Sequence, residues 1–313
     1  MRLLIAGGSG FIGKNLITSL PRNWTVFATY HRDMLFPDFV KRHNLANVQP
    51  IHCELSNKQD TQEKIGGLAD IDACVYLAAN TNVSSLVSEP TQDVLDNIVP
   101  LTHFLGAFRG TRLIFFSSGA VYMGLERAVS PDSKLSPTIP YSISKLASEH
   151  YIRFQATTKK TFNEYAIVRF FGAYGYHEPT RKITRRFLEQ ALSPSWPKIS
   201  MTLFGDGENL IDVMWVKDAI QAIMGLINAS KIDFTVDLCA GNACTINEYV
   251  AKLGKIVGKE VLVRHEGTSA EYIRFHASPE RMRKLIGFQA KTSLQEGIAR
   301  YIRWLKEQSS TKA

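Results

Sequence analysis

Three glycines stand at the first junction between an apolar segment and an amphipathic one. Residues 2–6 form a short apolar run, and Gly7, Gly10 and Gly13 follow it at regular spacing. In a strand-turn-helix unit the first glycine permits the sharp turn, the second lets backbone N–H groups approach a pyrophosphate, and the third lets the helix pack closely on the strand. The helix N-terminus adds free donors and a partial positive charge. The motif therefore predicts a site for the phosphates of a dinucleotide.

Short apolar runs alternate with amphipathic segments through the first half of the chain, which is typical of a parallel sheet covered by helices. We expect strands at residues 2–6, 25–29, 48–52, 73–77, 113–117 and 165–169, and helices at 11–20, 91–108 and 141–157. The expected fold class is α/β, a doubly wound parallel Rossmann sheet with a smaller α+β substrate-binding lobe.

The second lobe is expected to begin at Gly172, where Pro and Gly residues interrupt the pattern. A strand at 235–239, with the helix before it, is expected to return to the first lobe. The first lobe, which binds NAD(P), then takes residues 1–171 and about 211–240, and the substrate-binding lobe takes 172–210 and 241–313. A chain of 313 residues exceeds the usual size of a single core, which fits this division.

The composition is that of an ordinary globular protein, with 45% hydrophobic and 21% charged residues. No stretch approaches the roughly 18 consecutive apolar residues of a membrane helix, and the N-terminus lacks the pattern of a secretory signal. We therefore expect a cytoplasmic protein. The formal charge of +8 is spread along the chain without a long basic run, so anionic small molecules are expected as partners rather than nucleic acid. The four cysteines lack the paired spacing of zinc sites, so no metal is expected.

The end of the second expected strand carries the residues that distinguish between the two dinucleotides. The segment reads Tyr30-His31-Arg32, with no acid until Asp33. An acid here accepts hydrogen bonds from the ribose 2′-hydroxyl of NAD, whereas the planar fork of an arginine matches a 2′-phosphate. The segment predicts that NADP(H) is preferred, with His31 and Arg32 at the cofactor. NAD(H) stays open, because Asp33 can serve a 2′-hydroxyl and Arg32 can be a solvated surface residue.

Tyr141 and Lys145 are four residues apart in the helix expected at 141–157, so they share one face. A free tyrosine has a pKa of ~10, and acting as a base near neutrality requires a fall of about three units. The ammonium of Lys145, together with an oxidised nicotinamide, is expected to favour the phenolate. Tyr141 would then exchange a proton with a substrate hydroxyl while a hydride passes between the same carbon and the cofactor.

Two serines stand at the end of the strand expected at 113–117. Ligands of open parallel sheets bind beyond the carboxyl ends of the strands, so Ser118 is the candidate for holding the substrate oxygen and orienting its proton. Ser117, one residue earlier on the pleat, is expected to face the cofactor or the backbone. Ser118, Tyr141 and Lys145 form the expected catalytic triad.

Together these motifs resemble the extended short-chain dehydrogenase/reductases, the nucleotide-sugar epimerase/dehydratase family. The resemblance covers nearly the whole chain. It is carried by Gly7, Gly10 and Gly13, Leu77-Ala78-Ala79, Asn97, Ser118 to Tyr122, Tyr141 with Lys145, Arg169-Phe170-Phe171, Tyr174-Gly175, Gly205-Asp206-Gly207, Asp212, Val216 with Asp218, and Leu285 to Phe288 before Thr292 and Leu294.

The resemblance implies an NAD(P)-dependent oxidoreductase that acts on a nucleotide-linked sugar. For the cofactor it implies contacts with Gly7, Ser9, Gly10, Phe11, Ile12, Gly13, Glu54, Leu55, Leu77, Ala78, Ala79, Asn97, Ser117, Tyr141, Lys145 and Phe171. For the substrate it implies contacts with Thr81, Asn82, Ser118, Gly119, Gly172 and Phe204. It also implies a homodimer paired through the helices at 91–108 and 141–157. Phe104, Leu105, Phe108, Ile152 and Phe154 are candidates for that contact, and equally for the core.

The residues after Ser118 narrow the reaction. Family members that eliminate water from the sugar usually carry an Asp-Glu pair there, because elimination needs a further acid and base. This chain has Gly119 and Ala120, so neither a 4,6-dehydratase nor a uronic-acid decarboxylase is expected. Reduction of a keto-sugar is expected first, because a 2′-phosphate site at Arg32 suits a consumed reductant. NAD-dependent 4-epimerisation is the alternative, and a non-catalytic dinucleotide sensor is the second alternative.

Two positions depart from the family pattern where it contacts the substrate diphosphate. Gly172 stands where the family often has Asn, and Ile211 stands where it has an Arg before an Asp. Two interpretations follow. Either a nearby arginine replaces these contacts, the candidates being Arg181, Arg185, Arg186 and Arg274, or the substrate carries no nucleotide diphosphate.

Overall fold

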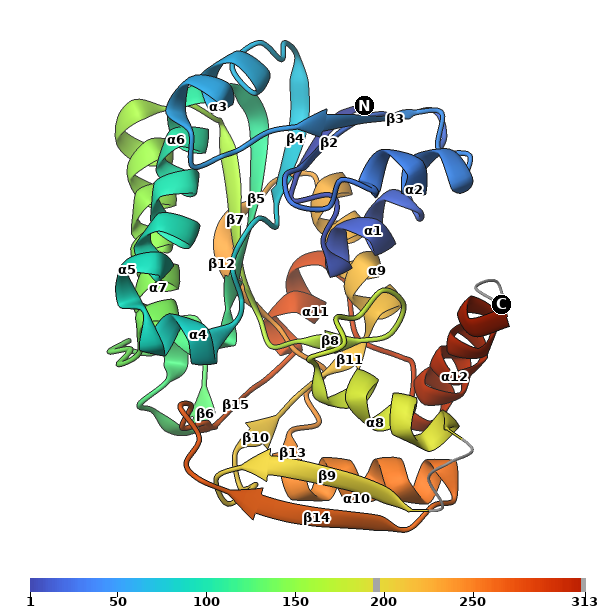
Figure 1. The fold of residues 1–313 in the computed structure, drawn as a ribbon. Helices are drawn as coiled ribbons and strands as arrows, with labels where there is room; N and C mark the ends of the chain where they lie inside the picture. Colours follow the sequence, from blue (N-terminus) through green and yellow to red (C-terminus); the bar gives the residue numbers. More distant parts are fainter. Residues whose placement is uncertain (194–197, 311–313) are drawn as a thin grey trace.

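The structure is a computed structural model, and it describes residues 1–193 and 198–310. Its centre is a sheet of seven parallel strands in the order β12, β7, β5, β4, β1, β2, β3 (Figure 1). These strands are β1 (Arg2–Ala6), β2 (Thr25–Tyr30), β3 (Val48–His52), β4 (Ile71–Tyr76), β5 (Gly110–Ser118), β7 (Glu164–Phe170) and β12 (Asp233–Leu238). The direction of winding reverses between β1 and β4, and such a reversal opens a crevice at the carboxyl ends of the strands. The expected fold class is confirmed.

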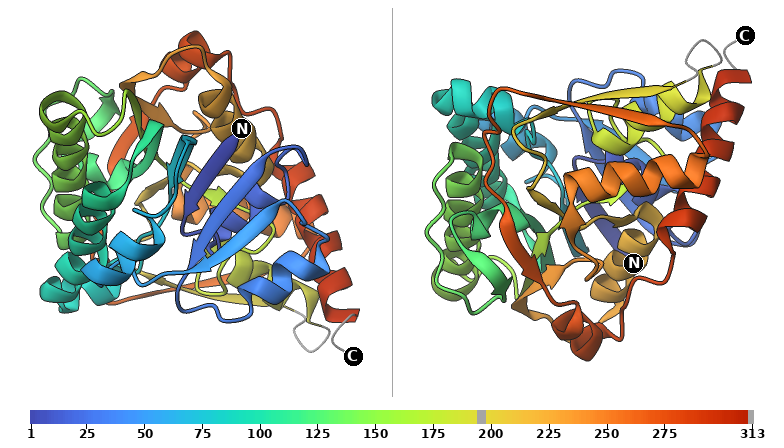
Figure 2. Two further views of the ribbon diagram at one scale, coloured as in Figure 1. Left: turned by 90° about the horizontal axis from the view of Figure 1, so that it is seen from above. Right: turned by 90° about the horizontal axis from the view of Figure 1, so that it is seen from below.

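Helices cover both faces of the sheet (Figure 1, Figure 2). One face carries α1 (Phe11–Ile17), α2 (Phe36–Arg42), α9 (Val216–Asn228) and α11 (Glu280–Ile286), and the other carries α3 (Lys58–Lys64), α6 (Val99–Ala107) and α7 (Pro140–Phe154). Along β1, Leu3 and Ile5 belong to the first core, and Leu4 and Ala6 to the second. Because both faces are buried, the central strands are continuous apolar runs.

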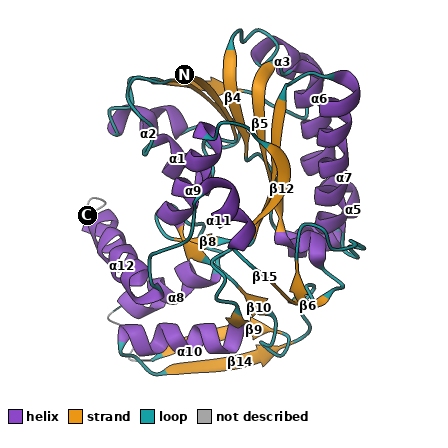
Figure 3. Ribbon diagram, turned by 180° about the vertical axis from the view of Figure 1, so that it is seen from behind, coloured by secondary structure: helices purple, strands orange, loops and turns teal. Residues whose placement is uncertain are grey.

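The second lobe lies beyond the carboxyl ends of the strands (Figure 3). It contains α8 (Ile183–Leu192), α10 (Ile246–Val257) and α12 (Leu294–Ser310), with short strand pairs. These pairs are β8 (Ala173–Tyr174) with β11 (Met214–Trp215), β9 (Ile199–Phe204) with β14 (Val261–Glu266), β10 (Leu210–Ile211) with β13 (Cys244–Thr245), and β6 (Glu126–Val129) with β15 (Arg274–Ala277). A separate apolar core around Trp215, Tyr249 and Tyr301 stabilises the lobe. The boundaries assigned to the two lobes from the sequence stay a prediction.

The observed strands lie within three residues of the expected ones, whereas two helices differ more. The helix expected at 91–108 is divided into α5 (Pro90–Asp93), a π-helical turn (Val94–Ile98) and α6. Pro100 has no N–H to donate to the carbonyl of Asp96, four residues earlier, so the helical hydrogen bonding is interrupted there. The helix expected at 141–157 is α7, followed by a π-helical turn (Gln155–Lys159). No helix in the described part of the chain is long and apolar enough to cross a membrane.

A buried ionic network joins α7 to three central strands. Glu149 on α7 accepts hydrogen bonds from Arg169 on β7 at 2.9 and 2.8 Å, and from Ser117 on β5 at 2.7 Å. Arg169 also donates to the hydroxyl of Tyr122, which in turn donates to Asp237 on β12, both at 2.8 Å. Burial raises the pKa of Glu149, but the hydrogen bonds and charges of Arg169, Ser117 and Arg153 together outweigh burial and hold this pKa below its usual value. The ionised pair therefore holds α7 in place against the sheet.

Replacing Glu149 by Gln should lower the free energy of unfolding by about 3–5 kcal/mol, because Arg169 would keep a buried charge without its partner. Urea denaturation measures the change. Glu260→Gln is the control, since it breaks an exposed ion pair with Lys198, whose nitrogen lies 2.8 Å from the carboxylate, and should cost less than about 1 kcal/mol. Equal losses in the two variants would contradict the importance assigned to Glu149.

Candidate active site

A cavity of about 620 Å³ lies where the glycine loop, the carboxyl ends of the central strands and the second lobe meet. Many of the residues predicted from the sequence line it: Gly7, Gly10, Phe11, Ile12, Gly13, Leu77, Ala79, Thr81, Ser117, Ser118, Gly119, Tyr141, Lys145, Phe171, Gly172 and Arg181. Other predicted residues are not part of the lining: Ser9, His31, Arg32, Glu54, Leu55, Ala78, Asn82, Asn97, Arg185, Phe204 and Arg274. The structure therefore brings the glycine loop and the triad together in one cavity.

The glycine loop approaches its neighbours too closely for larger side chains. Gly7 has a φ of 88°, and a Cβ there would lie 2.8 Å from the backbone nitrogen of Ala78. A Cβ at Gly13 would lie 2.5 Å from the carbonyl oxygens of Gly7 and Gly8. Thr29 on β2 fixes the loop from the other side, because it accepts hydrogen bonds from the backbone nitrogens of Gly7 and Gly8. This tight backbone cradle fits a pyrophosphate.

The segment after β2 carries charges of both signs. The side chain of Arg32 is 76% exposed, and its guanidinium lies 3.7 Å from the carboxylate of Asp96. Asp33 accepts a hydrogen bond from the ammonium of Lys14 on α1 at 2.7 Å. His31 is exposed beside them. The carboxylate that could serve a ribose 2′-hydroxyl thus already has a cationic partner.

The expected triad is assembled at the N-terminal end of α7. The helix begins at Pro140, whose fixed φ and missing N–H suit the first helical position. Ser118 and Tyr141 both line the cavity, and Ser118 lowers the pKa of Tyr141. The ammonium of Lys145 donates to the carbonyl of Phe116 at 3.0 Å and lies 5.8 Å from the centre of the Tyr141 ring. Tyr141 and Lys145 are 7% and 5% exposed, so both are almost removed from bulk water.

The acidity of Tyr141 differs from the expectation. Burial raises its pKa to about 12, the charges of Glu271 and Asp93 add to this rise, and Ser118 opposes it only in part. Burial also lowers the pKa of Lys145 to about 8. The protein's own groups therefore do not produce the expected fall in the pKa of Tyr141, because burial disfavours the charged form of both residues. An oxidised nicotinamide bound in this cavity would supply a positive charge that favours the phenolate.

Asn97 connects the loop after β4 with the catalytic helix. Its side-chain oxygen accepts a hydrogen bond from the backbone nitrogen of Asn80 at 2.8 Å, and its nitrogen donates to Asp93 at 2.7 Å. Asp93 in turn accepts a hydrogen bond from Ser144 on α7. The predicted role of Asn97 near the cofactor is therefore accompanied by an observed structural role, which is to hold one wall of the cavity against α7.

The second lobe contributes charged groups that the sequence did not single out. Glu178, Lys182 and Glu271 all line the cavity. Burial raises the pKa of Glu178 to about 8 and also raises that of Glu271. Burial and the neighbouring charge of Arg181 lower the pKa of Lys182. No local motif marks these residues, and Glu271 is about ninety residues away from Glu178 and Lys182 in the sequence.

The arginines predicted to replace the missing diphosphate contacts are placed differently from one another. Arg181 lines the cavity and donates to the hydroxyl of Thr81 at 2.8 Å. Arg185 pairs with Glu189 at 2.6 Å, and Arg274 lies 3.3 Å from Asp206. The remaining predicted residues in this region are exposed, namely Asn82, Arg186 and Phe204. Arg181 is thus the one of these four arginines that the described lining includes.

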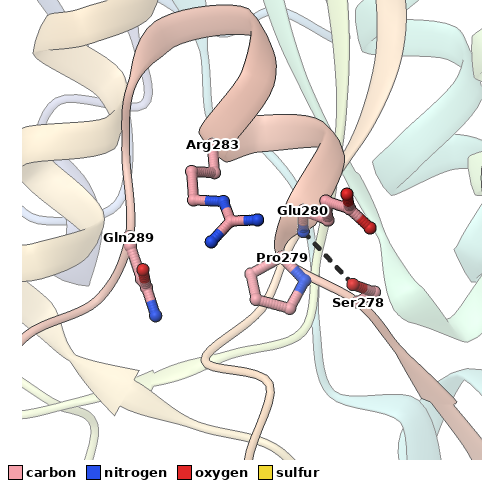
Figure 4. Close-up of a pocket in the computed structure, with 5 residues that line it drawn as sticks. All are labelled: Ser278, Pro279, Glu280, Arg283 and Gln289. Atoms are coloured by element: carbon pink, nitrogen blue, oxygen red, sulfur yellow. Dashed lines mark hydrogen bonds between the residues drawn. The ribbon is translucent and has the colours of Figure 1, made fainter.

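A second, smaller hollow of about 220 Å³ lies at the start of α11 (Figure 4). It is lined by Ser278, Pro279, Glu280, Arg283 and Gln289, none of which lines the larger cavity. It also contains none of the residues predicted to be catalytic. The predicted catalytic residues therefore belong to the larger cavity.

We expect Tyr141 to stay protonated up to about pH 12 in the protein alone, and to titrate at lower pH when an oxidised dinucleotide is added. A positive charge favours the phenolate, so it lowers the pKa. The phenolate absorbance lost in Tyr141→Phe reports this titration, and the variant should bind the dinucleotide as the wild type does. A phenolate that forms at the same pH with and without the dinucleotide would contradict the expectation.

Comparison with known proteins agrees with this fold. A putative UDP-glucose 4-epimerase of Methanocaldococcus jannaschii is 27% identical over 99% of this chain and its own full length. A UDP-glucose 4-epimerase of Thermotoga maritima, solved with UDP-glucose, superposes with a TM-score of 0.86 at 22% identity, over 99% of this chain and all of that one. A UDP-glucuronic acid 4-epimerase of Bacillus cereus, solved with UDP-glucuronic acid and NAD, gives 0.85 at 23% identity, over 98% and 100% of the two chains.

The family assignment rests on a family model that matches more than half of the chain. The model of the NAD dependent epimerase/dehydratase family matches residues 3–236, which include the glycine loop, Ser118, Tyr141 and Lys145. The same range includes all seven strands of the central sheet up to Val236 in β12. The chain belongs to the NAD dependent epimerase/dehydratase family.

Proposed function

We propose that the chain transfers a hydride reversibly at a ring carbon of a nucleotide-linked sugar, and that its net reaction is 4-epimerisation. One observation carries the proposal: Ser118, Tyr141 and Lys145 line the same cavity as the glycine loop, and the ammonium of Lys145 lies 5.8 Å from the centre of the Tyr141 ring. A proton-transfer group and a dinucleotide cradle thus border the same space. The relatives named as epimerases support the same chemistry.

Each member of the triad has a separate task in this reaction. Tyr141 takes the proton of the sugar hydroxyl as the carbon is oxidised, and it returns the proton when the ketone is reduced from the other side. Ser118 holds the sugar oxygen and orients its proton. Lys145 stabilises the transient phenolate by its charge. The glycine loop would hold a dinucleotide, which would supply a reversible hydride acceptor and would not be consumed.

Elimination of water and net reduction of a keto-sugar are the alternatives to epimerisation. Elimination of water needs an additional acid and base next to the sugar, and Gly119 and Ala120 in the cavity lining provide neither. Net reduction of a keto-sugar is the second candidate. It is favoured by the cation at Arg32 and by the pairing of Asp33 with Lys14, because an Asp33 whose charge is balanced by Lys14 repels a 2′-phosphate less.

We also propose that NADP(H) binds more tightly than NAD(H), because Arg32 can attract the 2′-phosphate and Lys14 balances the charge of Asp33.

Incubation with UDP-, dTDP-, GDP- and CDP-hexoses tests the reaction, with either oxidised dinucleotide present in catalytic amount. We expect the 4-epimer of one sugar to form without accumulation of reduced cofactor, and none to form with Tyr141→Phe. Stoichiometric consumption of reduced cofactor by a 4-keto-sugar, without epimer, would instead identify the reductase. Titration of the protein with NADP and NAD tests the cofactor preference, and tighter binding of NAD would contradict it.

We also propose a homodimer through the same two helical segments that were inferred from the sequence, although Phe154 is the one of the five candidate residues that stays exposed there. Phe104, Leu105, Phe108 and Ile152 are at most 1% exposed, so they belong to the core. The apolar side chains that remain exposed on the same helical layer are Val94 (44%), Leu95 (47%), Ile143 (49%), Tyr151 (43%) and Phe154 (44%). Exposed apolar side chains gathered on neighbouring helices favour contact with a partner.

The paired substitution of Tyr151 and Phe154 by Glu should convert the dimer into a monomer, because it would place two like charges in each half of the contact. Sedimentation velocity at micromolar concentration measures the change. Leu262→Glu on β14 is the control, since Leu262 is 49% exposed on a different element and should leave the dimer intact. A wild type that sediments as a monomer would contradict the proposal.

A further inference from the structure

Two positions of the cavity wall, Gly172 and Ile211, carry no polar side chain. At these positions the family pattern has residues that contact the substrate diphosphate. Gly172 has a φ of 135°, and a Cβ there would lie 3.0 Å from a methyl group of Val213. An asparagine would therefore be strained at this position. Ile211 lines the same cavity and offers only hydrocarbon. An anion in the cavity has to be bound by other residues.

Two neighbouring cations line the cavity at the beginning of α8. Arg181 hydrogen-bonds with the neutral hydroxyl of Thr81, on the loop after β4. Lys182 forms no ion pair within 4.0 Å among the residues that the structure describes. The charges of Glu178 and Glu271 raise its pKa by Coulombic attraction over a longer distance. Arg181 and Lys182 also act on each other as like charges. An anion between them would relieve this repulsion.

The other basic side chains near the cavity already have partners. Lys145 donates to the carbonyl of Phe116 and belongs to the triad. Arg185 is bound to Glu189, and Arg274 donates to Asn209 at 2.9 Å. Within the described lining, Arg181 and Lys182 are therefore the cations that remain available for an anionic ligand.

We propose that Arg181 and Lys182 together bind the diphosphate of the substrate. They would replace the Asn and Arg of the family pattern, which this chain lacks. The identity of the ligand rests on the proposed function, whereas the anion site itself rests on the two side chains. The planar guanidinium of Arg181 can contact two phosphate oxygens at once, and the ammonium of Lys182 supplies a point charge. Of the two interpretations left open by the sequence, this one retains a nucleotide diphosphate as part of the substrate.

Calorimetric titration with UDP, dTDP, GDP and CDP tests the site without any turnover, in the presence of a saturating oxidised dinucleotide that occupies the glycine loop. For the nucleotide that binds best, Arg181→Gln and Lys182→Gln should each weaken binding about tenfold or more, as expected for a lost charge-assisted hydrogen bond. Both variants should also show a weaker dependence of affinity on salt. With the full substrate, KM should rise while kcat changes little.

Arg185→Gln is the matched control, because it removes the same type of charge from the same helix but from a side chain bound to Glu189. It should leave the affinity for the nucleotide unchanged, and all three variants should keep the wild-type affinity for the dinucleotide. Wild-type affinity in both Arg181→Gln and Lys182→Gln would overturn the proposal, as would an equal loss in Arg185→Gln or a wild type that binds none of the four nucleotides. Weakened binding in a protein that turns over no sugar would instead refute the proposed function and leave the anion site standing.

Discussion

The buried ion pair between Glu149 and Arg169 is the contact on which the active-site geometry depends. Glu149 lies on the same helical face as Tyr141 and Lys145, at successive spacings of four residues. Its carboxylate is fixed by Arg169 from β7 and by Ser117, which directly precedes Ser118. The orientation of α7 and the end of β5 are thus set by the same carboxylate. Two ions in the core are costly to bury, so they are tolerated only when their hydrogen bonds are satisfied.

The parts of the site that depend on local patterns were predictable from the sequence. Gly7 and Gly13 are required because backbone atoms approach them within 3 Å of a Cβ position, and such a requirement leaves a glycine motif in the sequence. Tyr141 and Lys145 share a helical face whatever the surrounding fold, because their spacing fixes it. The parallel sheet also follows from local patterns, since strands buried on both faces become continuous apolar runs.

The parts that depend on distant segments were not predictable. Lys182 and Glu271 meet in one cavity although about ninety residues separate them, and neither has a neighbour in the sequence that marks it. The acidity of Tyr141 depends on burial, which a spacing of residues does not reveal. In the same way, Phe104 and Ile152 read equally well as core or as interface, and their burial against the sheet settled the choice.

The pairing of β8 with β11 has a consequence for how ligands reach the cavity. These strands belong to two segments that pass between the central sheet and the lobe beneath it, and their backbones are hydrogen-bonded to each other in parallel. A movement of the lobe away from the sheet would have to bend both segments together. It would also disturb the packing of Trp215 against Tyr174 and Tyr176. Such hydrogen-bonded connections oppose hinge opening, so we expect the sheet and the lobe to stay together while ligands enter and leave.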